Sequence, residues 1–372
     1  MALTTKPYKG ARDFYPEDKR LQKFVFNTWR QAVERYGYEE YDAPIIEPLE
    51  IYLAKTGSEI VDEQTYAFTD RGKREVVIRP EMTPSVSRMV AAKRQELAYP
   101  LRLFSIPNLW RYERPQRGRL REHWQLNVDI FGVASENAEL ELIGLADHIF
   151  KSFGADQSMY EIRINHRGLV NEILMNYLDL DNQSAHQVGK LIDRKSKMDQ
   201  SDFLSQLDEI LSAKNKAAKA PEKLLDILNA RKPTDLPSEV KSNEYYQQLV
   251  KLLEGLDLPN VVYSPEVMRG FDYYTGIVFE VFDTDPENNR AMMGGGRYDG
   301  LVGLFGVEPV PTVGFGWGDV TLVNFLDAHS LAPKLKPETD VYVCLIGDIY
   351  SSAQARINEL RQQGINVAVD LS

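Results

Sequence analysis

A run of arginines between two strand-like segments constrains the fold of this 372-residue chain more than any other feature. The run lies within eleven residues and comprises Arg111, Arg114, Arg117, Arg119 and Arg121. Pro115 and Gly118 interrupt it, which favours a loop. The segments 101–110 and 124–132 are apolar and rich in strand-forming residues. The pattern therefore predicts a long antiparallel hairpin with fixed cations at its tip and inner face.

Arginine is suited to such a site because its planar guanidinium grips phosphate or carboxylate with two parallel hydrogen bonds. The alternative is a solvated hairpin tip that makes only weak surface ion pairs. Glu113 and Glu122 are interleaved with the arginines. They either hold the guanidinium groups in place or accept hydrogen bonds from an amine and a base edge. We favour a site for a polyanion, and specifically a nucleotide.

Composition excludes several other classes of protein. The net charge of −11 argues against a general nucleic-acid-binding module, although a local basic patch still permits a nucleic-acid partner. The single Cys344 excludes a disulfide framework and a cysteine zinc site, and the five scattered histidines give no metal-site spacing. No apolar leader and no stretch of eighteen apolar residues is present. We therefore expect a cytoplasmic protein without a membrane partner.

The first half of the chain predicts helices and strands in alternation. A helix from Glu17 should end at Gly37, followed by a strand over 38–46 that Pro44 interrupts, and this pair is a plausible dimer surface. Strands are expected at 64–68, 75–79 and 160–165, and helices at 85–97 and 137–153. Between them, Pro80 and Pro84 favour a rigid bend that holds Arg79, Glu81 and Thr83 close together. A helix start with Glu81 in its first turn is the alternative.

In the second half of the chain, the predicted secondary structure changes from helices to strands. Residues 167–257 predict a helical insertion whose lysines form a solvated face. Strands are then expected at 260–264 and 276–282, and Arg269 just before the second of these needs an anion if it is buried. Gly314, Gly316 and Gly318 alternate along a strand, so that one of its faces is stripped of side chains and leaves room for a flat ligand.

The C-terminal part predicts a linker and one β-α-β unit. The linker occupies 331–338, and the unit covers 339–372. A lone β-α-β unit does not cover both faces of a parallel sheet, so we expect a domain that is incomplete here.

Taken together, the arginine hairpin, the segments RPEMT and GGGRYDGL, and above all RGFDYYTGIVFE resemble the histidyl-tRNA synthetase family of class II aminoacyl-tRNA synthetases. The resemblance covers essentially all of 8–372. It implies an α+β fold: an antiparallel catalytic sheet flanked by helices (1–166 and 258–330), a helical insertion (167–257) and the start of a C-terminal α/β anticodon-binding domain. It also implies a homodimer, with L-histidine, ATP, Mg²⁺ and histidine tRNA as substrates, cofactor and partner.

The resemblance assigns roles to residues of the ATP site. Arg111 would grip the α-phosphate and the carboxylate side of the amino acid, and Arg119 would reach the outer phosphates. Glu113 would accept from the adenine amino group, and His123, where the family usually has Phe, would stack on adenine. Gly316 and Gly318 would line the adenosine pocket. Arg269 resembles the family's catalytic arginine, which stands where other class members place a metal.

The resemblance likewise assigns the histidine site. Glu81 and Thr83 would hold the α-ammonium group, with Gln125 beside them. Asp129 and Tyr274 would address the imidazole nitrogens, Tyr273 would shape the pocket, and Arg269, Gly294 and Gly296 would complete it. These residue types suit histidine, because its neutral ring presents one donor and one acceptor.

Two features depart from the family. Thr321 stands where the third class signature ends in an ATP-binding arginine, which either weakens ATP binding or requires another residue to supply the cation. The incomplete anticodon domain puts tRNA discrimination in doubt. Both features suit the main alternative, a non-catalytic histidine-binding regulatory subunit of ATP phosphoribosyltransferase. The intact arginine hairpin and Arg269 favour the synthetase.

Overall fold

The computed structural model describes residues 3–53, 64–195, 198–268, 274–288 and 290–371. The chain divides into two compact units. The first comprises Met1–Asp13 and Val25–Leu331, and the second comprises Phe14–Phe24 and Ala332–Ser372.

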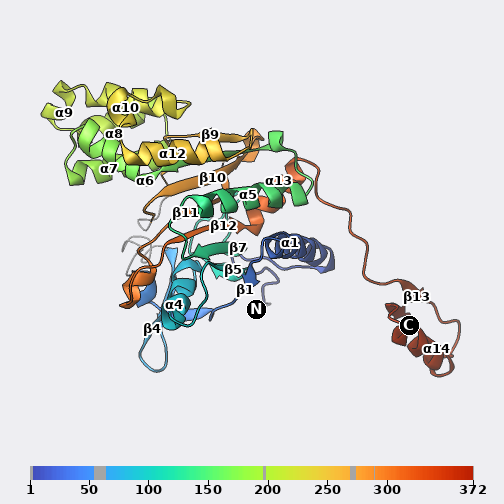
Figure 1. The fold of residues 1–372 in the computed structure, drawn as a ribbon. Coiled ribbons are helices and arrows are strands. Elements are labelled where there is room, and N and C mark those ends of the chain that lie inside the picture. The colour runs from blue at the N-terminus through green and yellow to red at the C-terminus, as the bar shows by residue number, and fades with distance from the viewer. Residues whose placement is uncertain (1–2, 54–63, 196–197, 269–273, 289, 372) are drawn as a thin grey trace. The chain divides into compact units, whose positions relative to one another are not determined.

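The described part of the first unit is built on a nine-stranded sheet with the order β1-β5-β7-β12-β11-β10-β8-β9, in which β6 also pairs with β7 (Figure 1). The strands are β1 Glu39–Glu40, β5 Leu101–Ser105, β6 Asn108–Trp110, β7 Glu122–Phe131, β8 Tyr160–His166, β9 Val261–Tyr263, β10 Ile277–Asp283, β11 Ala291–Arg297 and β12 Thr312–Gly318. The central strands from β5 to β8 are antiparallel to their neighbours, whereas β1 and β9 add in parallel at the edges. The predicted antiparallel sheet flanked by helices is therefore confirmed.

Helices α5 (Asn137–Ser152) and α13 (Asp319–Ala328) cover one face of this sheet (Figure 1). Alternate strand residues supply the apolar core beneath them, because successive side chains point to opposite faces. The Phe150 ring of α5 lies 4.2 Å from the ring of Trp317 on β12 and 5.3 Å from Phe325 of α13. All three side chains are fully buried. The predicted helix at 137–153 is confirmed.

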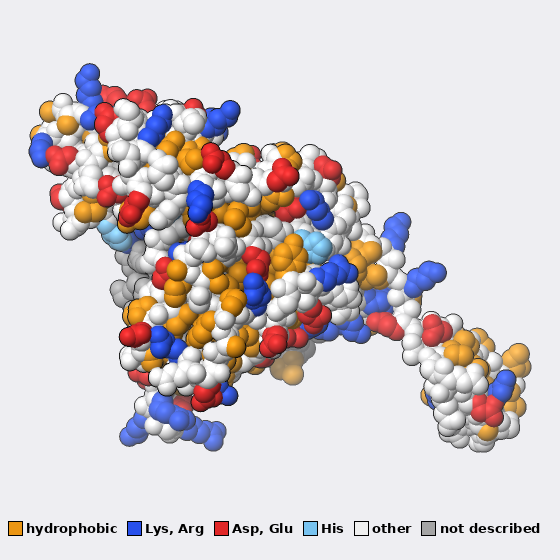
Figure 2. All heavy atoms as spheres, viewed as in Figure 1, with side chains coloured by type: hydrophobic (Ala, Val, Ile, Leu, Met, Phe, Trp, Pro, Cys, Tyr) orange, Lys and Arg blue, Asp and Glu red, His pale blue; other side chains and the backbone are white. Residues whose placement is uncertain are grey.

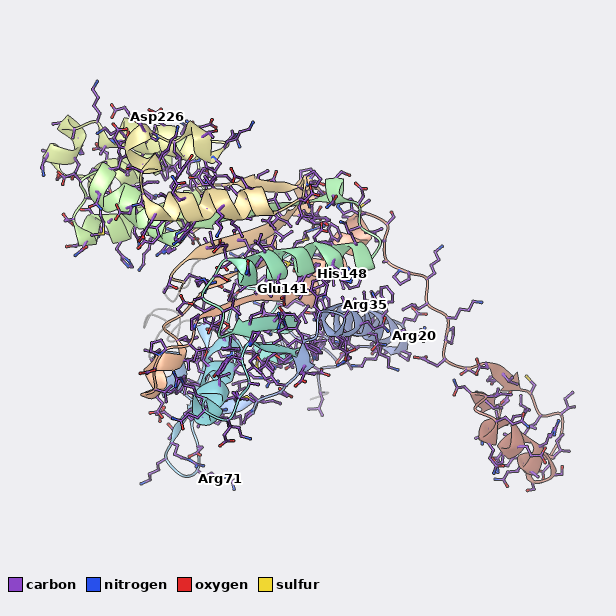
Figure 3. The ribbon with its side chains drawn as sticks, viewed as in Figure 1. Arg20, Arg35, Arg71, Glu141, His148 and Asp226 are labelled. Carbon is purple, nitrogen blue, oxygen red and sulfur yellow. The ribbon has the colours of Figure 1, made fainter. Side chains whose placement is uncertain are left out.

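A second, three-stranded sheet has the order β2-β4-β3, with β2 Ile46–Pro48, β3 Tyr66–Thr69 and β4 Glu75–Ile78. The single strand predicted over 38–46 is split: its first part is β1, and the chain enters the other sheet only at Ile46, just after Pro44. The predicted turn between β3 and β4 is present, with Arg71 at its tip (Figure 3). Its exposed basic side chains protrude from the surface (Figure 2).

The remaining helices of the first half are α1 Pro16–Glu34, α2 Glu50–Leu53 and α4 Thr83–Lys93. Helix α1 ends three residues before Gly37, which has a φ of +80°, as the predicted stop requires. Pro84 lies in the first turn of α4, so that helix begins two residues earlier than predicted.

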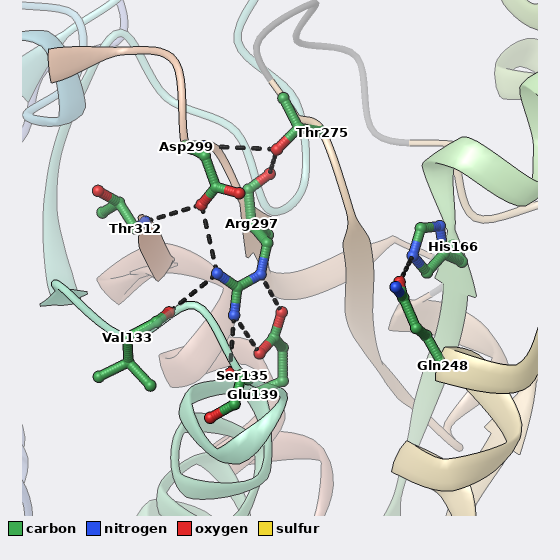
Figure 4. Close-up of polar contacts among 9 residues, drawn as sticks. All are labelled: Val133, Ser135, Glu139, His166, Gln248, Thr275, Arg297, Asp299 and Thr312. Atoms are coloured by element: carbon green, nitrogen blue, oxygen red, sulfur yellow. Dashed lines mark hydrogen bonds and ion pairs between the residues drawn. The ribbon is translucent and has the colours of Figure 1, made fainter. Parts of the chain in front are cut away.

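The described residues of 167–257 fold into helices. These are α6 Arg167–Glu172, a π-helical turn Ile173–Tyr177, α7 Asn182–Arg194, α8 Gln200–Ile210, α9 Ala213–Ala217, α10 Ala220–Asn229, α11 Ser238–Lys241 and α12 Glu244–Gly255. Helix α12 joins them to the sheet by packing on β8 and α5. Gln248 of α12 lies 3.0 Å from the His166 ring at the end of β8 (Figure 4). Short 3-10 turns occur at Gln157–Met159, Pro233–Asp235, Pro286–Asn288 and Val302–Phe305.

The second unit contains the predicted β-α-β element. Strands β13 (Val341–Val343) and β14 (Val367–Val369) pair in parallel, and helix α14 (Tyr350–Gln362) connects them. Among all the helices that the structure describes, none is long and apolar enough to cross a membrane.

Candidate active site

The arginine run forms the tip of an antiparallel hairpin built from β6 and β7, as predicted. Arg111 donates its backbone N–H to the carbonyl of Arg121, which extends the strand pairing beyond β6. At the tip, the backbones of Gln116 and Arg119 exchange two hydrogen bonds of 2.9 Å. Gly118 closes this turn with a φ of +74°, a left-handed conformation that favours glycine. The hairpin therefore holds its arginines on a fixed backbone.

The arginines differ in how their charge is used. Arg119 pairs with Glu113, with Nε 2.8 Å from Oε2, so Glu113 holds a guanidinium in place. Arg111 donates from Nε to the Pro80 carbonyl at 2.9 Å, and no carboxylate of a described residue forms an ion pair with it. Its position is thus fixed while its charge remains available to an anion.

His123 lies among these cations on β7. Loss of solvent and the nearby charges of Arg111, Arg12 and Arg119 lower the pKa of this half-buried imidazole to about 3. The ring is therefore neutral at physiological pH, which suits the predicted stacking on a base. Burial is the largest cause of this low pKa, and the three arginines add to it, since like charges disfavour protonation.

Strand register places the predicted glycines in one patch. Asp129 pairs with Gly314, which pairs with Gly296; Asn127 pairs with Gly316, which pairs with Gly294. Directly paired residues share a face of an antiparallel sheet. We call this patch the glycine face; it consists of Gln125, Asn127, Asp129, Gly294, Gly296, Gly314 and Gly316, on the side of the sheet opposite α5 and α13.

Polar and aromatic side chains occupy the space that these glycines leave. A Cβ built on Gly316 would lie 2.9 Å from the Gln125 carboxamide, and one on Gly296 would lie 2.8 Å from the Tyr274 ring. A Cβ on Gly314 would collide with the carboxylate of Asp129. A larger residue at any of these glycines would displace one of the side chains predicted to bind histidine.

Asp129 is the buried carboxyl of the glycine face, with only 3% of its surface exposed. Burial raises its pKa to about 7, and a hydrogen bond from the Tyr298 hydroxyl opposes that rise. Tyr274, the other residue predicted to address the imidazole, meets the Tyr298 ring edge-on with centroids 6.3 Å apart. Tyr298 was missed by the sequence reasoning, although it directly follows the glycine-rich strand.

The RPEMT segment lies against the same hairpin. Its Pro80 carbonyl accepts from Arg111, and its Glu81 is buried just before α4, which begins at Thr83. The Tyr52 hydroxyl donates to the Glu81 carbonyl at 3.2 Å. Glu81 thus lies outside the helix, as the predicted bend requires, whereas Thr83 and Pro84 lie in the first turn of α4, so a helix does start within this segment.

Two predicted residues, Arg269 and Tyr273, lie outside the described residues. Arg297, at the end of β11, is described, and its side chain is held by contacts within the protein. Its guanidinium forms two 2.7 Å bonds to Glu139 and also donates to the carbonyls of Val133 and Ser135 (Figure 4).

Contacts between distant segments, which we call the clasp, were also not predicted from the sequence. Arg12 forms a 2.6 Å ion pair with Asp319, whose other oxygen accepts from the backbone N–H of Trp124 at 3.0 Å. The Gly10 carbonyl accepts from the N–H groups of Arg121 and Glu122. The clasp ties the N-terminal segment, the hairpin and the start of α13 together, directly after the predicted ATP-binding Gly318.

Known proteins resemble this chain throughout its length. A histidyl-tRNA synthetase family profile matches residues 10–318. The histidine–tRNA ligase of Leptospira biflexa is 46% identical over 372 residues, which covers 99% of this chain and 85% of that protein.

Two solved structures share the fold, each with a TM-score of 0.80. The histidyl-tRNA synthetase from Nostoc sp. PCC 7120 is 21% identical, and the alignment covers 100% of this chain and 87% of that one. A Bacillus halodurans protein described as an ATP phosphoribosyltransferase regulatory subunit/histidyl-tRNA synthetase is 24% identical, with 100% and 94% covered. At these identities the structures establish the class II fold, whereas the profile and the Leptospira relative show that this chain belongs to the histidyl-tRNA synthetase family.

Proposed function

We propose that this chain activates L-histidine with ATP and transfers the histidyl group to the 3′ end of histidine tRNA in the cytoplasm. The main support for this activity is family membership, because a histidine–tRNA ligase is 46% identical across 99% of the chain. The positively charged hairpin beside the glycine face supports it, since adenylate formation needs fixed cations next to an amino-acid pocket. A regulatory subunit, which only binds histidine, has no use for the unpaired charge of Arg111.

In the first step a carboxylate oxygen of histidine attacks the α-phosphorus of ATP. The bond from that phosphorus to the bridging oxygen breaks, and pyrophosphate leaves with its electron pair. Because negative charge spreads over the phosphoryl oxygens, catalysis rests on positioning and electrostatic stabilisation. We assign Arg111 to the α-phosphate, Arg119 to the outer phosphates, and Arg269 to the reacting carboxylate and phosphate.

Mg²⁺ would enter with ATP. The residues that the structure describes contain no group of three carboxylate, histidine or cysteine side chains placed to hold a metal. This fits an ion held largely by substrate phosphates and water, as is usual for Mg²⁺. It would neutralise charge on the departing pyrophosphate.

Adenine would lie between the hairpin and the glycine face. Glu113 uses Oε2 to hold Arg119, which leaves Oε1 to accept from the adenine amino group. The neutral His123 ring offers a stacking surface that does not add a further positive charge. Gly316 and Gly318 let the nucleoside approach the β12 backbone closely.

Histidine would bind over the opposite part of the glycine face. We assign its α-ammonium to Glu81, Thr83 and Gln125, and its imidazole to Asp129 and Tyr274. The raised pKa of Asp129 reflects a buried carboxyl without a cationic partner among the described residues. An imidazole N–H would give this carboxyl a second donor beside the Tyr298 hydroxyl, and a purely apolar amino acid provides no such donor. Tyr273, Gly294 and Gly296 complete the pocket in this assignment.

In the second step a hydroxyl of the terminal tRNA ribose attacks the carbonyl carbon of histidyl-adenylate. The bond between the carbonyl carbon and the phosphate oxygen of this mixed anhydride breaks, AMP leaves with the electron pair, and the hydroxyl proton is released.

We further propose that the protein works as a homodimer. The small sheet and α2 expose four apolar side chains, Ile45, Ile46, Leu53 and Phe68, each between 43% and 53% accessible. Burial of these side chains against a second copy of the chain would remove apolar surface from water.

Histidine-dependent exchange of labelled pyrophosphate into ATP tests the proposal. The wild-type protein should catalyse exchange with histidine and not with lysine, and Arg111→Ala should abolish it. Arg356→Ala is the matched control, because it removes an exposed arginine of α14 that pairs with Glu359 of the same helix. Histidine binding without exchange would refute the synthetase and favour the regulatory subunit.

A further inference from the structure

A pocket of about 300 Å³ opens beside the tip of the arginine hairpin. The hairpin, the turn before β11 and helix α13 provide its walls, which consist of Gln116, Arg117, Gly118, Glu287, Asn288, Arg290, Met292, Thr321 and Asn324. Its size is at the lower end of small-molecule sites. The lining includes two arginines and one carboxylate, so the pocket favours an anion.

Thr321 contributes no charge to this pocket. Its hydroxyl lies 2.9 Å from the Met292 carbonyl and 3.0 Å from the Gly318 carbonyl, so it is engaged with the backbone. Its methyl carbon Cγ2 lies 3.6 Å from the position of a Cβ built on Gly118. Thr321 therefore turns its apolar end toward the hairpin tip.

Arg290 lies near the same glycine. Its Cδ is 3.8 Å from that Cβ position, which places the arginine stem against the hairpin tip. Its charge acts on the hairpin, since Arg290 and Arg111 both lower the pKa of Arg119 after the larger effect of burial. Three like charges converging on one region are stabilised when an anion binds there.

The two arginines of the pocket differ in whether a carboxylate pairs with them. Arg117 donates to Asn288 at 3.1 Å and lies 3.6 Å from the carboxylate of Glu287. Arg290 forms no ion pair with any carboxylate in the part of the chain that the structure describes. Its charge is the one left for a ligand.

The turn that carries Arg290 is well supported. Asn288 donates to Asp283 of β10 at 2.7 Å and to the Asn324 carbonyl of α13 at 3.3 Å. The other oxygen of Asp283 lies 2.7 Å from His329 at the end of α13. These contacts fix Pro286–Asn288, just before Arg290, against the helix that bears Thr321.

We infer that Arg290 binds the β- and γ-phosphates of ATP, and the pyrophosphate that leaves, in this pocket. It supplies from the turn before β11 the cation that Thr321 does not provide from α13. The guanidinium can bind two phosphate oxygens through a planar pair of parallel N–H groups, a geometry that neither a lysine nor a hydroxyl offers. This inference rests on the proposed function.

Pyrophosphate exchange with Arg290→Ala tests it. We expect the KM for ATP and the KM for pyrophosphate to rise about 10- to 100-fold, the usual loss for a charged hydrogen-bonding group. The KM for histidine should stay within twofold, and Arg356→Ala should match wild type. Adding Thr321→Arg to Arg290→Ala should recover most of the affinity for ATP, because it returns a cation to the same pocket.

Binding of histidyl sulfamoyladenosine, an adenylate analogue without β- and γ-phosphates, separates a local loss from misfolding. Arg290→Ala should bind this analogue as tightly as wild type. An unchanged KM for ATP, or an equal loss of affinity for the analogue, would overturn the inference. Absence of exchange by the wild-type protein would instead contradict the proposed function, so the two failures are distinguishable.

Discussion

Helix α5 carries two glutamates that form nearly identical ion pairs in different surroundings. Glu139 binds Arg297 through two hydrogen bonds of 2.7 Å, and Glu141 binds Arg102 through two of the same length. The side chains of the first pair are 2% and 10% exposed, and those of the second are 25% and 30% exposed. Replacing each glutamate with glutamine removes the charge while keeping the shape and one acceptor.

We expect Glu139→Gln to cost about 3 kcal/mol of unfolding free energy, because it removes the buried carboxylate that binds Nε and Nη2 of Arg297 and leaves only the 3.3 Å contact with the partly exposed Asp299. The carbonyls of Val133 and Ser135 still accept from Arg297, which keeps the cost at the lower end of the range for a broken buried pair. Glu141→Gln should cost no more than about 1 kcal/mol, since water can solvate the half-exposed Arg102.

Urea unfolding followed by tryptophan fluorescence measures this difference. All four tryptophans lie within Val25–Leu331, so the signal reports the first unit alone. With a slope near 3 kcal/mol per molar, Glu139→Gln should lower the midpoint by ~1 M and Glu141→Gln by a third of that or less. Equal midpoints for the two variants would refute the argument that burial, rather than geometry, determines the cost.

Two further predictions concern the glycine face. Gly316→Ala should lower kcat/KM for pyrophosphate exchange at least tenfold, because its Cβ would displace the Gln125 carboxamide. The control is Gly144→Ala in α5, where a Cβ meets nothing within 4 Å. This control should keep activity and gain up to about 1 kcal/mol of stability. Equal activity of these two variants would count against the assigned site. The pKa of Asp129 is about 7 in the folded protein, above that of an aspartate in the unfolded chain. Its contribution to the unfolding free energy is therefore greatest below pH 4 and is lost as the pH rises through 7. Asp129→Asn should therefore gain unfolding free energy relative to wild type between pH 4 and 8, and a pH-independent difference would contradict this.

Local sequence patterns predicted many of the strands and helices, although β11 and α13 were not among them. The arginine run between apolar flanks predicted the hairpin, because turn residues and strand periodicity act over a few positions. Alternating glycines predicted a bare strand face, and register then placed Gly314 and Gly316 opposite Asp129 and Asn127. Pro44 marked a strand break, although the sequence did not indicate that the two parts enter different sheets.

Contacts between distant segments were not predictable in this way. Arg12 and Asp319 are 307 residues apart, and nothing local to either residue identifies its partner. Tyr298 reaches Asp129 only through the pairing of β11, β12 and β7. Thr321 showed that a cation was missing, but only the packing of the turn before β11 against α13 brings Arg290 to the same pocket.

The glycine face also dictates which substitutions the sheet can accept. Along β12, Val313, Phe315 and Trp317 are buried on the side that α5 and α13 cover, where loss of volume is costly. Between them, Gly314 and Gly316 admit no added carbon without a collision. A saturation-mutagenesis map of this strand should thus alternate between positions that reject small residues and positions that reject everything but glycine. Both faces of β12 would therefore tolerate few substitutions, one because it cannot lose side-chain volume and the other because it cannot gain any.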